Sequence, residues 1–130
     1  MVKEISLRPT DGELEILNVL WEQGPSTVRE IHEKLIRNKL TGYTTVLKLL
    51  QIMTDKGLVK RDDTRRAHIY VATHAQEQTQ RQLVNDLLEK VFKGSTVRLV
   101  MQALATEEKA SAEELSQIQQ LLDQHRRNAR

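Results

Sequence analysis

The sequence predicts a mainly α-helical protein whose N-terminal part is of the α+β class and whose C-terminal part is helical. Apolar residues recur at helical spacing through most of the 130-residue chain. Two short strand-like runs, residues 58–61 and 68–72, flank a charged turn, and no strand signal appears after Thr73. We therefore expect an N-terminal module over residues 1–73 and a helical region over residues 74–130.

Three helices are expected in the N-terminal module, over about residues 11–22, 28–38 and 43–56. The pairs Thr10/Glu13 and Thr27/Glu30 have the spacing of a capping box, which predicts the first two helix starts. A polar link through Asn38 and Lys39 leads to the third helix. The side chains expected to face the core are Leu14, Ile16, Leu17, Leu20, Trp21, Val28, Ile31, Leu35, Ile36, Val46, Leu49, Leu50 and Met53.

A β-hairpin is expected to follow the third helix. Gly57 suits the C-terminal cap of that helix, because a left-handed backbone conformation costs glycine little. Ile69 and Val71 then alternate with His68, Tyr70 and Ala72, the period of a strand covered on one face. Three helices and a hairpin within about 70 residues make one compact module.

The C-terminal region is predicted to form helices over about residues 75–93, 96–105 and 112–127, with capping boxes at Thr73/Gln76 and Ser111/Glu114. These helices carry too few large side chains to close a core, so their apolar stripes need another surface. A second copy of the chain is the simplest candidate, which predicts a homodimer. The dimerisation residues are then Leu83, Leu87, Val91, Val97, Val100, Met101, Leu104, Leu115, Ile118 and Leu122.

Composition excludes several classes of function. Aromatic residues make up only 3 % of the chain, which argues against single-strand or RNA recognition by stacking. There is no cysteine, and the four histidines lack metal-ligand spacing, so we expect no metal and no cofactor. No arrangement of nucleophile, base and oxyanion site is visible, so an enzyme is not expected. No apolar run spans a bilayer, and we expect a soluble, cytoplasmic protein without membrane insertion.

Charge is unevenly distributed along the N-terminal module. Residues 9–33 contain six acidic residues and one basic residue, whereas residues 37–66 contain eight basic and three acidic residues. A module polarised in this way would present its basic segment to a polyanion. Ordinary surface charge is the alternative explanation.

The third helix and the hairpin are the candidate DNA-binding elements. After the inward stripe is set aside, the helix offers hydroxyl, amide and ammonium groups that suit base edges in a major groove. The hairpin adds cations that suit phosphates. The alternatives are a solvated helix face and a turn charged for solubility. The DNA-binding candidates are Tyr43, Thr44, Thr45, Lys48, Gln51, Lys60, Arg61, Arg65 and Arg66.

Several segments, taken in order, resemble the penicillinase-repressor family of the BlaI, MecI and CopY type. They are residues 14–21, 25–31, 43–46 with Leu49, 56–59, and Tyr70. The resemblance spans nearly the whole chain, including Gly94. It implies a winged helix-turn-helix repressor that dimerises through its C-terminal helices and occupies a palindromic operator on double-stranded DNA.

The resemblance also implies a means of release. In the antibiotic-responsive branch, a membrane-bound sensor metalloprotease triggers a cut in the C-terminal region, which maps here to Gln102 and Ala103. The copper-responsive branch uses C-terminal cysteines, which this chain lacks. Two other functions stay open: a winged-helix regulator controlled by a small ligand, and a winged helix used only for protein interaction.

Overall fold

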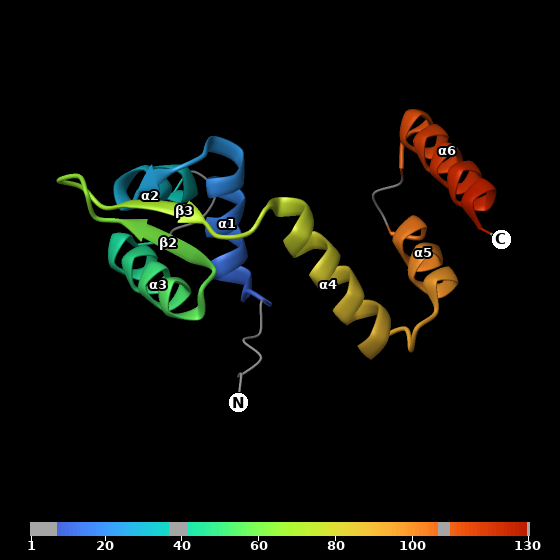
Figure 1. Cartoon of the computed structure of the whole chain (residues 1–130), viewed down its shortest axis with the longest axis horizontal. Coiled ribbons are helices and arrows are strands. Elements are labelled where there is room, and N and C mark those ends of the chain that lie inside the picture. Colours follow the sequence, from blue (N-terminus) through green and yellow to red (C-terminus); the bar gives the residue numbers. More distant parts are fainter. Residues whose placement is uncertain (1–7, 37–41, 107–109, 130) are drawn as a thin grey trace. The chain divides into compact units, whose positions relative to one another are not determined.

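Three helices and a small sheet make up the N-terminal part of the computed structural model, which describes residues 8–36, 42–106 and 110–129 (Figure 1). The chain divides into two units, residues 1–85 and 86–130, and the division falls inside the fourth helix. The elements in order are α1 (Asp11–Gln23), β1 (Ser26–Thr27), α2 (Val28–Ile36), α3 (Tyr43–Lys56), β2 (Val59–Asp62), β3 (Ile69–Ala72), α4 (Gln76–Lys90), α5 (Thr96–Leu104) and α6 (Ala112–Asn128).

The first unit has one apolar core, formed where α1, α2 and α3 pack together and against the sheet. Most of the predicted inward positions are buried. Ile36 is an exception at 48 % exposed, because it lies in the last turn of α2, beyond the buried position Leu35. The core consists of Ile16, Leu17, Val19, Leu20, Val28, Ile31, Leu35, Val46, Leu50, Met53, Leu58, Val59 and Tyr70.

Both capping boxes predicted in this unit are present. The Thr10 hydroxyl accepts from the Glu13 amide while the Glu13 carboxylate accepts from the Thr10 amide, and α1 begins at Asp11 as expected. Thr27 and Glu30 make the same reciprocal pair at the start of α2. The predicted link through Asn38 and Lys39 lies outside the described residues.

The sheet is antiparallel, with strand order β1-β3-β2. The sequence did not predict β1, which pairs Ser26 with Tyr70 and Thr27 with Ile69 and so brings the start of α2 beside the hairpin. The covered face of β3 carries Tyr70, which is 1 % exposed, whereas Val71 on the other face is 38 % exposed. Gly57 ends α3 in the predicted left-handed conformation, with φ 84°.

One predicted capping box is absent, although α4 begins at Gln76, within one residue of the expected start. The buried Thr73 hydroxyl oxygen, which should have capped this helix, has no hydrogen-bond partner in the described part of the chain. The reason is that Thr73 still belongs to the sheet end, where its amide donates to the Leu58 carbonyl oxygen at 3.0 Å.

The second unit contains the end of α4 together with α5 and α6. The Ser111/Glu114 capping box that opens α6 is present as predicted, and Ser95 caps α5. Neither α5 nor α6 has a buried residue. In the described ranges, every helix is too short or too polar to span a bilayer.

Candidate nucleic-acid interface

The outward face of α3 is the first component of the candidate interface. Val46, Leu50 and Met53 anchor the helix in the core, so the positions between them point outward. The DNA-binding candidates predicted on this helix are all exposed: Tyr43, Thr44, Thr45, Lys48 and Gln51.

The polar groups on this face are available to a ligand. Within the described residues, no hydrogen bond or ion pair occupies the side chains of Thr45, Lys48 or Gln51. Tyr43 is held at the start of the helix by His32 of α2, whose ring meets the phenol edge-to-face with 5.7 Å between centroids. The face therefore combines free hydroxyl, ammonium and amide groups with one pre-positioned aromatic ring.

The hairpin is the second component, and its charges are not equivalent. The Arg61 guanidinium donates to Asp63 through Nε at 2.8 Å and Nη2 at 3.3 Å, and these hydrogen bonds, with one to Tyr70, raise the pKa of Arg61. Hydrogen bonds from the Thr64 hydroxyl and amide lower the pKa of Asp62. Arg65 and Arg66 make no such hydrogen bond or ion pair among the described side chains, so they are the freer cations of the turn.

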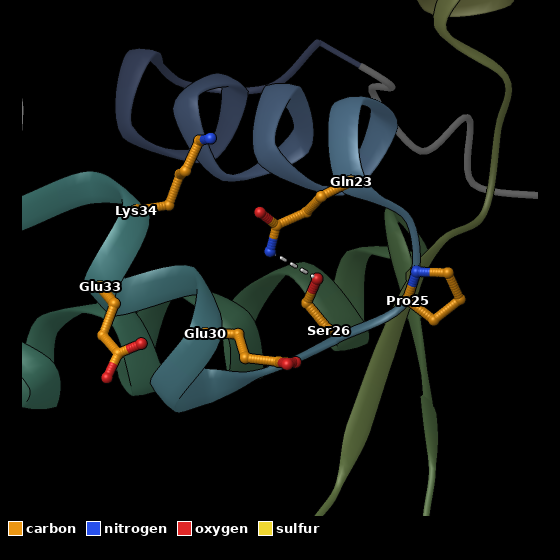
Figure 2. A pocket seen from close by; sticks show the side chains of 6 residues that line it. All are labelled: Gln23, Pro25, Ser26, Glu30, Glu33 and Lys34. Atoms are coloured by element: carbon orange, nitrogen blue, oxygen red, sulfur yellow. Dashed lines mark hydrogen bonds between the residues drawn. The ribbon is translucent and has the colours of Figure 1, made fainter.

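Two hollows border α2, and their chemistry differs. The first is lined by Gln23, Pro25, Ser26, Glu30, Glu33 and Lys34 (Figure 2), and its two carboxylates would repel a phosphate. The second opens between α2, the first turn of α3 and the hairpin, and it is lined by Thr27, Val28, Arg29, Tyr43, Leu47, Arg66, Ala67, His68 and Tyr70. Only the second joins predicted DNA-binding residues from two elements, Tyr43 and Arg66.

Sequence reasoning missed Arg29. It stands among acidic residues, and nothing in the local pattern marks it. The signal that would have placed it beside the hairpin is the pairing of Thr27 with Ile69, but a two-residue strand has no readable period.

The predicted dimerisation residues lie on unpartnered surfaces. Val97 and Met101 on α5 are 68 % and 60 % exposed, and Leu115 and Leu122 on α6 are also exposed. Leu83 and Ile118 are half-buried.

Gln102 and Ala103, where the resemblance maps a cut, are exposed in the last turns of α5. Among the described residues, no group of three or more His, Asp or Glu side chains could hold a metal ion.

A family model described as "Penicillinase repressor" matches residues 9–124. This covers nearly the whole chain. The chain belongs to the penicillinase-repressor family. Family membership confirms the resemblance predicted from the sequence.

Of two relatives of this chain, one is named a transcriptional regulator and the other a repressor. "Transcriptional regulator BlaI" of Mycobacterium tuberculosis is 36 % identical over 80 residues, which are 59 % of this chain and 58 % of that protein. "Penicillinase repressor" of Bacillus licheniformis is 20 % identical over 117 residues, covering 90 % of this chain and 91 % of that protein. The chain thus spans 58 % of the length of the mycobacterial relative.

Two solved structures share the fold. The DNA-binding domain of the repressor BlaI in solution matches 58 % of this chain and 90 % of that domain, with TM-score 0.50 and 21 % identity. A crystal structure of a transcriptional regulator from Thermotoga maritima matches 93 % of this chain and 79 % of that one, with TM-score 0.51 and 20 % identity. The predicted fold class, a winged helix-turn-helix with a helical C-terminal region, is confirmed.

Proposed function

We propose that this protein is a cytoplasmic transcriptional repressor that binds a palindromic operator through its winged helix-turn-helix. The observation that carries the proposal is the outward face of α3, where Thr45, Lys48 and Gln51 are exposed and unengaged within the described residues. Such groups can hydrogen-bond base edges in a major groove, and the unpaired arginines of the hairpin suit flanking phosphates. The names of the relatives support the same function.

The proposal is tested by selecting duplexes from a random pool with the full chain. The expected outcome is a palindromic consensus bound far more tightly than non-cognate DNA, with an affinity that falls steeply with salt. A pool that gains no consensus, or a chain without salt-dependent affinity for duplex DNA, would favour the protein-interaction module instead.

We further propose that the repressor acts as a homodimer joined by the second unit. The exposed apolar side chains of α5 and α6 support this, because no core of their own covers them. Two recognition helices on a dimer would read half-sites about 34 Å apart, one turn of B-DNA.

Release by proteolysis is proposed at Gln102 and Ala103, with a membrane-bound sensor metalloprotease as partner. Their exposed position in a short helix without buried residues supports access after local unfolding. Mass spectrometry of the repressor from induced cells should then find fragments ending at Gln102. Replacing Gln102 by glutamate and Ala103 by lysine, which are both good helix formers, should keep the chain intact and the target gene silent.

Control by a small ligand is the second candidate, and one observation favours it. The second unit contains a hollow lined by Val91, Phe92, Lys93, Arg98, Met101 and Gln102. Thermal stabilisation by one compound, together with loss of operator binding and an uncut chain, would identify ligand control.

A further inference from the structure

The groove between α2, α3 and the hairpin has a volume of about 520 Å³ and lies entirely within the first unit. Its sides carry two guanidinium groups, Arg29 from α2 and Arg66 from the hairpin, together with the imidazole of His68. No carboxylate is among its lining residues. This makes it the basic counterpart of the acidic hollow shown in Figure 2.

The fold itself brings these charges together. Pairing of Thr27 with Ile69 fixes the start of α2 against β3, so Arg29 stands across the groove from the hairpin turn. Neither guanidinium has a hydrogen bond or ion pair among the described residues. By contrast, Arg61 is neutralised by Asp63. Arg29 and Arg66 therefore have donors free for an incoming anion.

We propose that this groove seats one phosphate of the DNA backbone, held by Arg29 and Arg66 together. The inference rests on the proposed DNA binding and adds to it a contact on α2. A guanidinium presents parallel donors that match phosphate oxygens. Tyr43 also lines the groove and opens α3, so a phosphate held there fixes where the DNA-binding candidates of α3 meet the base edges.

The test measures affinity of the full chain for its selected duplex by fluorescence anisotropy across a salt series. The variants are Arg29→Ala, Arg66→Ala and the double variant, with Arg81→Ala on exposed α4 as the matched control. Each groove variant should bind about tenfold more weakly, to cognate and non-cognate duplexes alike. Because one phosphate is shared, the double variant should lower the slope of log affinity against log salt by about 0.9.

Two outcomes would contradict the sharing of one phosphate by Arg29 and Arg66. The first is an affinity of the Arg29→Ala variant within about twofold of the unaltered chain. The second is a slope of log affinity against log salt that falls by about 1.8 in the double variant, because that value corresponds to two separate phosphates. The Arg81→Ala control should match the unaltered chain. Arg29→Lys should restore part of the affinity, because it returns the charge without the planar donors.

Two further measurements are needed. One distinguishes a DNA phosphate from a free phosphate ion in the groove, and the other distinguishes failure of DNA binding from failure of the Arg29 contact. Millimolar inorganic phosphate, added at constant sodium concentration, should leave duplex affinity unchanged, because one phosphate held by two surface arginines binds weakly without the rest of the DNA. Competition at this concentration that disappears in the Arg29→Ala/Arg66→Ala variant would assign the groove to a free anion. An unaltered chain that binds no duplex would overturn the proposed function and this seat together. A chain that binds duplex without involving Arg29 would overturn only the seat.

Discussion

Asp63 is an acidic residue of the hairpin turn, among the cations that we propose to contact DNA phosphates. It engages Arg61 through two hydrogen bonds and lies 3.6 Å from the Nε2 atom of His68. A carboxylate in this position occupies a cation that could otherwise contact a phosphate, and it repels the phosphate itself. If the hairpin contacts DNA as proposed, Asp63 should therefore restrain its affinity for DNA.

Replacing Asp63 by asparagine should strengthen duplex binding about three- to tenfold at low salt, for cognate and non-cognate DNA alike. The measurement is anisotropy with labelled duplexes at two salt concentrations. Glu77→Gln on exposed α4 removes an equal charge away from the hairpin and should have little effect. An unchanged or weaker affinity for the asparagine variant would contradict the restraining role.

Substitutions can distinguish the residues proposed to contact base edges from those proposed to contact phosphates. Alanine at both Thr45 and Lys48 should reduce the preference for the selected duplex over random DNA, because we propose that these groups contact base edges. Alanine at both Arg65 and Arg66 should weaken binding to both duplexes and flatten the salt dependence. The measurement is the affinity of both double variants and of the unaltered chain for both duplexes across a salt series. Parallel changes in the two double variants would refute the division.

At the level of elements, periodicity and capping predicted most of the N-terminal module. The helix starts at Asp11 and Val28 followed from reciprocal hydroxyl and carboxylate pairs, which are local in sequence. β1 was missed because its two residues form a strand only through pairing with β3. For the same reason Arg29 entered the candidate site only with the structure, whereas Tyr43 and Arg66 were already predicted from their own elements.

One ion pair joins α1 to α3 and was not visible in the sequence. Glu13 is 2 % exposed, and the Lys56 Nζ atom donates to both of its carboxylate oxygens at 2.9 Å. The separation of 43 residues gives no local signal. The pair fixes the C-terminal end of α3 to the N-terminal end of α1.

Lys56→Ala should cost more stability than Glu13→Gln. The alanine variant leaves a buried carboxylate with the Thr10 amide but without its cation, at about 2 kcal/mol or more. In the glutamine variant the amide oxygen can still accept from Thr10 and the Lys56 ammonium can turn to water, so the loss should be about 1 kcal/mol. Urea unfolding followed by the fluorescence of Trp21, the single tryptophan, measures both.

Lys34→Ala serves as the control for this pair, since Lys34 and Glu22 form a surface ion pair at 3.5 Å. Its loss should cost at most about 1 kcal/mol. Equal losses for Lys56→Ala and Lys34→Ala would show that the buried pair does not stabilise the junction of α1 and α3.

On the scale of the whole molecule, the two units differ in how they bury apolar surface. The first unit closes a core, whereas α5 and α6 leave their apolar stripes uncovered. The sequence predicted that the C-terminal helices could not close a core, because they carry too few large side chains. It predicted the boundary between the two regions only from the end of the last strand, at Thr73. The division into residues 1–73 and 74–130 stays a prediction about where binding and dimerisation separate.

The dimer proposal leads to a prediction for α6. Leu115 and Leu122 are exposed on one face, so aspartate at both positions leaves the core of the first unit intact. The double variant should sediment as a 15.0 kDa chain instead of a dimer. Because the second docking event is no longer intramolecular, its affinity for a palindromic duplex should fall by a factor of about 10² to 10⁴.

Affinity for a duplex with a single half-site distinguishes a loss of dimerisation from damage to the DNA-binding surface of α3 and the hairpin. That affinity should be unchanged in the Leu115→Asp/Leu122→Asp variant, because α3 and the hairpin keep their side chains. Gln120→Asp, on the opposite face of α6, should sediment and bind like the unaltered chain. A double variant that stays dimeric would place the dimer contact elsewhere, and a monomeric one with full affinity for the palindrome would refute the avidity mechanism.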